Sequence, residues 1–60
     1  MKSLRELRLK HYLSQAELAR KAGLSTATIN RLENGRRKPV FKTIRVLAEA
    51  LGVEPGEIEF

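Results

Sequence analysis

The sequence predicts an all-α fold, a compact five-helix bundle formed as a single domain over residues 1–60. Three observations support this prediction. The chain is short and has no cysteine, so no disulfide or thiolate ligand can brace it and the fold must close by packing alone. Serine caps recur ahead of segments whose apolar residues follow the helical repeat. Glycines stand where several of these segments should end.

The first two helices are expected over residues 4–11 and 15–22. Each begins with a capping box, in which a serine oxygen and a glutamate satisfy free amides at the helix start. These boxes are Ser3 with Glu6, and Ser14 with Glu17. Gly23 can adopt a left-handed conformation at little steric cost, so we expect the second helix to end just before it.

The third helix is expected over residues 26–33. Ser25 is a suitable N-cap for it. Asn34-Gly35 should end it, because this dipeptide is typical of turns. Pro39 cannot sit in a helix interior, so the basic residues before it are expected to form an extended loop.

Two more helical segments complete the predicted bundle. Apolar residues recur at helical spacing over residues 44–51, and Gly52 follows at the position expected of a C-terminal glycine. Glu54 and Pro55 then suit the cap and the first residue of a short fifth turn, which is counted as the fifth helix of the bundle.

The segment of residues 15–33 has the layout of a helix-turn-helix, with two short helices joined by a tight turn. Ala19 is small where the helices should cross closely, Gly23 suits the turn, and Ile29 should fill the angle between the helices. The alternative is a helical hairpin with no role in binding nucleic acid.

The charge is distributed unevenly along the chain. The net charge is +5, and all 12 lysines and arginines lie in residues 1–45, whereas residues 46–60 hold four acidic residues and no basic one. A basic body suits nucleic acid or an anionic membrane surface, and an acidic end would be repelled by either. Without a membrane-spanning run or a secretory signal, a cytoplasmic protein with no membrane contact is expected.

Three sequence segments together are more specific than any one of them alone. They are S-Q-A-E-L-A-R-K-A-G-L-S (14–25), I-N-R-L-E-N-G-R-R-K-P (29–39) and L-A-E-A-L-G-V (47–53). This combination resembles the phage repressor and Cro family, also called the Xre family. The resemblance implies a lambda-repressor-like fold of five helices. In that fold the third helix enters the major groove, the second lies across the DNA backbone, and a dimer binds a palindromic operator.

The outward face of the third helix is expected to contact DNA bases. At about 100° per residue, the face opposite Ile29 carries the candidate base-contacting side chains. These are Thr26, Ala27, Asn30 and Arg31, with Thr28 on the flank. Arg31 can pair bidentately with guanine, and Ala27 can meet a thymine methyl. A phosphate contact or a solvated charge is the alternative for Arg31.

Phosphate contacts are expected around that helix. Gln15 lies in the first turn of the second helix, where a free amide and the positive end of the helix dipole favour an anion, and the resemblance implies a phosphate contact there. An ordinary exposed side chain is the alternative. The resemblance also implies phosphate contacts from the loop and the helix after it, at Asn34, Arg36, Lys38 and Lys42.

Arg8 is expected to play a structural part. It falls on the same helical face as Leu4 and Leu7, so its side chain should point inward. In the family that the sequence resembles, such an arginine reaches the glutamate of L-E-N-G. The resemblance therefore implies a partly buried ion pair between Arg8 and Glu33.

No catalytic residue, metal site or cofactor is expected. His11 is the sole histidine and has no partners at a spacing typical of metal ligands. At the acidic end, Ile58 and Phe60 leave two interpretations open. The tail either folds onto the bundle or forms a dimer contact.

The sequence thus predicts a sequence-specific double-stranded DNA-binding transcriptional regulator, expected to be a repressor, that acts as a homodimer at least on DNA. One alternative is the antitoxin of a toxin-antitoxin pair, which would use the same DNA face and hold a toxin partner through its C-terminal surface. Another is a non-DNA interaction module or a fragment of a larger protein.

Overall fold

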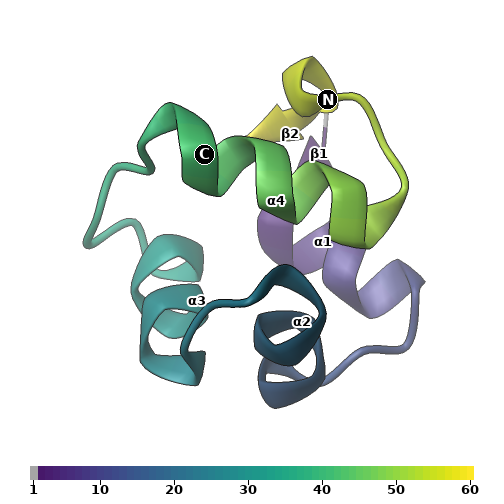
Figure 1. Cartoon of the computed structure of the whole chain (residues 1–60), viewed down its shortest axis with the longest axis horizontal. Helices are drawn as coiled ribbons and strands as arrows, with labels where there is room; N and C mark the ends of the chain where they lie inside the picture. The colour runs from purple at the N-terminus through teal and green to yellow at the C-terminus, as the bar shows by residue number, and fades with distance from the viewer. Residues whose placement is uncertain (1) are drawn as a thin grey trace.

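The computed structural model describes residues 2–60 and places four α-helices around one core. The helices are α1 (Leu4–Lys10), α2 (Gln15–Ala22), α3 (Thr26–Glu33) and α4 (Phe41–Leu51). In Figure 1, α4 lies in front of α1, with α3 and α2 below it. The predominantly helical fold expected from the sequence is therefore present, and α2 and α3 span the residues that the sequence predicted.

Side-chain caps define the starts of the first three helices. Both predicted capping boxes are formed, one on α1 and one on α2. At the start of α3, the Ser25 hydroxyl accepts from the Thr28 amide at 3.1 Å. α4 begins after Val40, which has no side chain able to cap it, so the first amides of α4 have no side-chain partner.

The core is formed by apolar side chains from all four helices and the C-terminal segment. Its buried members are Leu4, Leu7, Leu18, Ala19, Ala22, Ile29, Leu32, Leu47, Ala48, Leu51 and Ile58. The alanines on α2 let neighbouring helices approach it closely. Within residues 2–60, the longest and most apolar helix still falls short of what crossing a membrane requires.

The prediction of five helices is wrong, because four α-helices are present within residues 2–60, but the short turn predicted after α4 is formed, with Glu54 as its cap and Pro55 as its first residue. Residues after α4 form one 3-10 turn, η1 (Pro55–Glu57), in which the Glu57 amide donates to the Glu54 carbonyl at 2.9 Å. The turn does not continue into a helix because Ile58 is already extended, with φ −93° and ψ 125°. Ile58 is instead the first residue of a β-strand.

That strand is part of a small sheet that the sequence did not predict. β1 (Lys2–Ser3) and β2 (Ile58–Glu59) pair in parallel, with Lys2 opposite Ile58. Two residues are too few for an alternating apolar pattern to be visible in a sequence. Because Ile58 is also 4% exposed, this part of the tail folds onto the bundle, whereas Phe60 remains 46% exposed.

The turn between α1 and α2 contains a strained residue. Tyr12 has φ 57°, which lies in the left-handed region that residues other than glycine rarely adopt. The turn is closed by the Leu13 amide, which donates to the Arg8 carbonyl at 3.1 Å. The tyrosine ring is 93% exposed, so packing does not compensate for the strain.

We expect Tyr12→Gly to raise the free energy of unfolding by about 1 kcal/mol, because glycine adopts this conformation without a Cβ clash. Urea unfolding of the two proteins measures the difference. Tyr12→Ala is the control, since alanine removes the ring but keeps the strain, and it should give no gain. A glycine variant no more stable than the alanine variant would show that the backbone here carries no strain.

Candidate nucleic-acid interface

The angle between α2 and α3 is set by the turn at Gly23 and by the buried side chain of Ile29. Gly23 adopts φ 72° and ends α2, and the next amide, of Leu24, donates to the Ala19 carbonyl at 2.8 Å. Ile29 of α3 is 0% exposed and fills the space between the helices. A Cβ on Gly23 would meet no atom within 4 Å, so backbone conformation rather than space favours glycine here.

α3 presents one continuous exposed face. Its exposed residues include four of the five predicted base-contacting positions, namely Thr26, Ala27, Asn30 and Arg31. Thr28 differs, because it is half-buried and its hydroxyl lies 2.8 Å from the Ser25 hydroxyl. The structure therefore brings four of these side chains together and ties the Thr28 hydroxyl to the helix cap.

A basic loop follows α3. Gly35 adopts φ 68°, and the Arg36 amide donates to the Arg31 carbonyl at 2.9 Å, which turns the chain away from the helix. Arg36 and Lys38 are exposed in this loop, and Lys42 is exposed in the first turn of α4. The amides at the start of α4 have no side-chain cap, and they form the positive end of the helix dipole. These groups together can hold anions.

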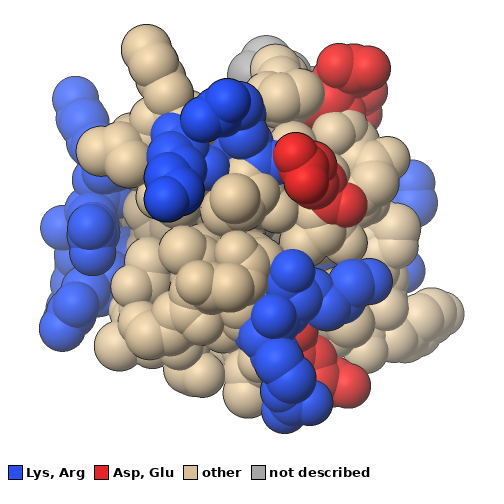
Figure 2. Space-filling view, in the orientation of Figure 1, with Lys and Arg blue, Asp and Glu red and all other residues tan. Residues whose placement is uncertain are grey.

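Basic side chains are most concentrated beside the loop after α3. In Figure 2, Lys and Arg gather at the left edge, where that loop lies in Figure 1, although further basic side chains appear elsewhere on this face. Acidic side chains appear mainly at the upper right, and one lies among basic side chains at the bottom. The C-terminal segment carries exposed Glu54, Glu57 and Glu59. A polyanion would therefore meet the α3 side and be repelled from the C-terminal side.

The ion pair implied for Arg8 and Glu33 is present and nearly buried. Arg8 Nε donates to Glu33 Oε2 at 2.6 Å and Nη2 donates to Oε1 at 3.0 Å, with side-chain exposures of 10% and 4%. Arg8 Nη1 also donates to the Leu13 carbonyl at 2.9 Å. Burial raises the pKa of Glu33, but hydrogen bonds from Arg8 and Gln15 outweigh it and hold the pKa below its ordinary value.

Gln15 is less free than the sequence suggested. Its Nε2 donates to Glu33 Oε1 at 3.2 Å, and its Oε1 accepts from Asn30 Nδ2 at 3.5 Å. Asn30 in turn accepts from Asn34 Nδ2 at 3.2 Å. Sequence reasoning missed these contacts, because Gln15 and Asn30 lie on different helices and nothing in their spacing marks them as neighbours.

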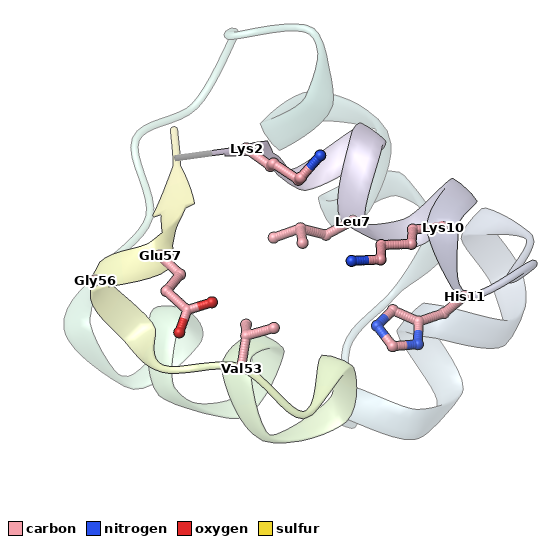
Figure 3. A pocket seen from close by; sticks show the side chains of 7 residues that line it. All are labelled: Lys2, Leu7, Lys10, His11, Val53, Gly56 and Glu57. Carbon is pink, nitrogen blue, oxygen red and sulfur yellow. The ribbon is translucent and has the colours of Figure 1, made fainter.

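A hollow of about 300 Å³ lies between α1 and the C-terminal segment. Figure 3 shows Lys10, at the end of α1, and His11, the residue after it, pointing into the hollow, with Glu57 on the opposite side and Leu7 and Val53 between them. Charges of both signs line it, so it is no continuation of the basic surface. Within residues 2–60, no three histidine or acidic side chains lie close enough to hold a metal ion.

A second hollow, of about 390 Å³, adjoins the basic loop, and we term it the loop groove. It is lined by Leu32, Gly35, Arg37, Lys38, Pro39, Ile44 and Phe60. Beside Pro39 in the chain, Val40 and Phe41 are 61% and 86% exposed. Such large exposed apolar side chains next to an apolar groove are typical of a protein contact surface.

Comparison with known sequences shows a match over most of the chain. A family model described as Helix-turn-helix matches residues 4–58. The uncharacterized HTH-type transcriptional regulator y4dJ of Sinorhizobium fredii is 40% identical over 52 residues, which cover 87% of this chain and 68% of that protein. Rv0023 of Mycobacterium tuberculosis, described in the same way, is 39% identical over 54 residues. Those residues cover 90% of this chain but only 21% of Rv0023, so this chain spans about a fifth of the mycobacterial relatives' length.

Two solved structures are similar throughout the fold. The restriction-modification controller protein C.AhdI from Aeromonas hydrophila has a TM-score of 0.88 and 42% identity, covering 90% of this chain and 82% of that one. The DNA-binding domain of the P22 C2 repressor has a TM-score of 0.85 and 28% identity, covering 88% and 70%. The resemblance noted from the sequence is thereby confirmed.

Proposed function

The chain belongs to the Helix-turn-helix family, and on that premise we propose that it is a sequence-specific double-stranded DNA-binding domain of a transcriptional regulator. α3 lies in the major groove, with α2 across the backbone. One observation carries this proposal. The exposed face of α3 is flanked by Gln15 on one side and by the basic residues of the following loop on the other.

The relatives support a regulator rather than an enzyme. The matched family is one of DNA-binding proteins, and two similar proteins are described as HTH-type transcriptional regulators. Repression is the proposed outcome, supported by the similarity to a repressor domain. No observation favours the antitoxin or a non-DNA module. Binding to DNA would suit the cytoplasmic location expected from the sequence.

Two kinds of contact divide the interface. Thr26, Ala27 and Arg31 contact base edges, because all three are exposed on α3. Within residues 2–60, the Thr26 hydroxyl and the Arg31 guanidinium make no side-chain hydrogen bond, unlike the side chains of Thr28 and Asn30. The phosphate contacts come from residues that surround them, namely Gln15, Asn34, Arg36, Lys38 and Lys42. Since two of the three base-contacting side chains are small, Arg31 supplies the strongest hydrogen-bonded discrimination.

Arg31→Ala is expected to cost about 1 to 3 kcal/mol on the preferred site and to relax the preference at one base pair, because a bidentate contact to guanine is lost. Fluorescence anisotropy against the preferred site and against random DNA measures the two affinities. Arg31 is exposed, so its removal should leave the fold intact.

Arg36→Gln is the matched control for Arg31→Ala. It removes one exposed cation that lies in the loop but does not line the loop groove, so it should weaken binding to all DNA about equally and reduce the salt slope by roughly one unit. If Arg31→Ala behaved in the same way as Arg36→Gln, Arg31 would be a phosphate contact.

We further propose that the protein binds a palindromic operator as a homodimer through the loop groove. In a two-fold dimer the same patch meets itself, so the exposed Phe41 of each copy can enter the groove of the other. The basic loop adjoins this patch. A contact there would set two α3 helices side by side on one face of DNA.

Phe41→Ser is expected to weaken dimerisation roughly a thousandfold, since each dimer loses two aromatic anchors and each contributes about 2 kcal/mol. Sedimentation with and without operator DNA measures this. Tyr12→Ser is the control, because Tyr12 is a similarly exposed aromatic residue that lies in the turn between α1 and α2 and not beside the loop groove in the chain. A wild-type protein that stays monomeric on a single half-site would contradict the dimer.

A further inference from the structure

Five polar side chains form a hydrogen-bonded series from the interior to the proposed DNA face. It begins at Arg8, which donates twice to Glu33, and continues through Gln15, whose Nε2 donates to Glu33 at 3.2 Å. Asn30 donates to Gln15 at 3.5 Å, the longest link, and Asn34 donates to Asn30 at 3.2 Å. The series joins α1 and α2 to the C-terminal half of α3 and to Asn34, which caps the end of α3.

The charge on Glu33 determines which group donates and which accepts at each hydrogen bond of this series. An ionised carboxylate only accepts hydrogen bonds, and the pKa of Glu33 lies below its ordinary value, so Glu33 is charged at neutral pH. Gln15 must therefore turn its NH₂ group toward Glu33 and its oxygen outward. That oxygen accepts a hydrogen bond from the NH₂ group of Asn30. The oxygen of Asn30 in turn accepts one from the NH₂ group of Asn34.

This orientation limits what Asn30 can do on DNA. Bidentate pairing with adenine needs the oxygen and one amide hydrogen of the same side chain. Asn30 has a protein partner at each end of its amide, so pairing with adenine would have to compete with the hydrogen bonds to Gln15 and Asn34, although a second amide hydrogen and a second oxygen lone pair remain. Within residues 2–60, Gln15 and Asn34 each have a second amide hydrogen with no protein acceptor, and a phosphate oxygen can accept it.

Building on the proposed function, we propose that Asn30 is a positioning residue rather than a base-contacting one. It holds the Gln15 and Asn34 side chains so that their free amide hydrogens face DNA phosphates. Fixing these donors before binding lowers the conformational entropy lost when the complex forms. Asn30 therefore increases the affinity for every DNA sequence, whereas the other exposed α3 side chains select among sequences.

NMR of the free protein tests whether the series exists. Gln15→Ala should shift the side-chain amide signals of both Asn30 and Asn34, although Asn34 does not touch Gln15 directly. Lys21→Ala, an exposed change on the same helix, should shift neither. If Gln15→Ala leaves the Asn34 side-chain signals unchanged, the series is absent and the proposal is overturned.

DNA binding tests what the series does. Asn30→Ala should weaken binding to the preferred site and to random DNA by the same factor, roughly two- to tenfold for one lost hydrogen-bonding partner. The ratio of the two affinities should stay unchanged. Thr26→Ala is the control, since Thr26 is exposed on the same face but lies outside the series, and it should alter that ratio.

Two results would overturn the positioning role. One is an Asn30→Ala variant that loses preference at a particular base pair while its affinity for random DNA is unchanged. The other is an Asn30→Ala variant with unchanged affinity for both DNAs. A wild-type protein with no sequence preference would instead contradict the proposed function, and the affinity of Asn30→Ala for random DNA would still decide the role of Asn30.

Coupling between the residues supplies a further check. Because Asn30 acts through Gln15, Asn30→Ala should weaken random-DNA binding less in a Gln15→Ala background than in the wild type. Independent effects, with the double variant weakened by the full product of the two factors, would contradict positioning through Gln15.

Discussion

Arg8→Ala is expected to lower the free energy of unfolding by about 3 kcal/mol at pH 7. The Glu33 side chain is only 4% exposed, so removing its main partner leaves a carboxylate buried with a single hydrogen bond from Gln15. The variant also loses the donor to the Leu13 carbonyl. A domain of this size rarely has more than about 3 to 5 kcal/mol in total, so much of the variant should be unfolded at 25 °C.

The pH dependence of this loss has a definite sign. In the wild type, hydrogen bonds hold the folded pKa of Glu33 below its ordinary value, so its stabilising contribution is present above pH 5 and is lost as the pH falls through that lowered pKa. In Arg8→Ala, burial without the arginine raises the pKa of Glu33, so acid relieves the penalty. The difference between the two proteins should therefore shrink from pH 7 to pH 4, as measured by urea unfolding.

Two controls separate the ion pair from a general effect of losing an arginine. Arg45→Ala, on the exposed face of α4, should change stability by less than about 0.5 kcal/mol. The double variant Arg8→Met with Glu33→Leu should recover most of the loss, since apolar residues can replace a buried pair. A pH-independent deficit for Arg8→Ala would contradict the assigned role of Glu33.

Ile29→Ala is expected to lower the free energy of unfolding by about 2 to 5 kcal/mol, because it opens a cavity between α2 and α3. The side chain is 0% exposed and sits at the angle that orients α3. Urea unfolding followed by circular dichroism measures the loss of stability. The amount of protein that binds DNA should fall in proportion to the folded fraction.

Ile29→Val is the matched control and should cost only about 0.5 to 1.5 kcal/mol. Ile44→Ala, at a partly exposed position of α4, should cost less than Ile29→Ala. Equal losses at Ile29 and Ile44 would show that the contact between α2 and α3 has no special weight in the fold.

Local signals predicted most of the fold. Serine caps, the glycines after α2 and α4, and the apolar repeat each act within a few residues, and the structure has helices where they indicated. The segment after Pro55 forms no α-helix because its last residues pair with a strand at the other end of the chain. Pairing with Lys2 and Ser3 holds Ile58 extended, and no signal near Pro55 records a partner at the other end of the chain.

The candidate site also combines features that local sequence predicts with features that depend on residues far apart in the sequence. The exposed face of α3 follows from helical geometry, and the Arg8 pair followed from a family resemblance together with an inward-facing position. The contacts of Gln15 with Glu33 and Asn30 join residues 18 and 15 positions apart on different helices, and no local pattern specifies which side chains meet at that distance in sequence. Likewise, the exposure of Phe41 depends on how the preceding loop turns.

Selection of binding sites from random double-stranded DNA tests the central proposal most directly. A regulator that acts as a homodimer should enrich one motif, with two inverted half-sites whose centres lie about 10 base pairs apart. Arg31→Ala should enrich a motif with a weaker preference at one base pair of each half-site. A pool that remains random after repeated rounds, although the protein still binds it, would contradict sequence-specific recognition.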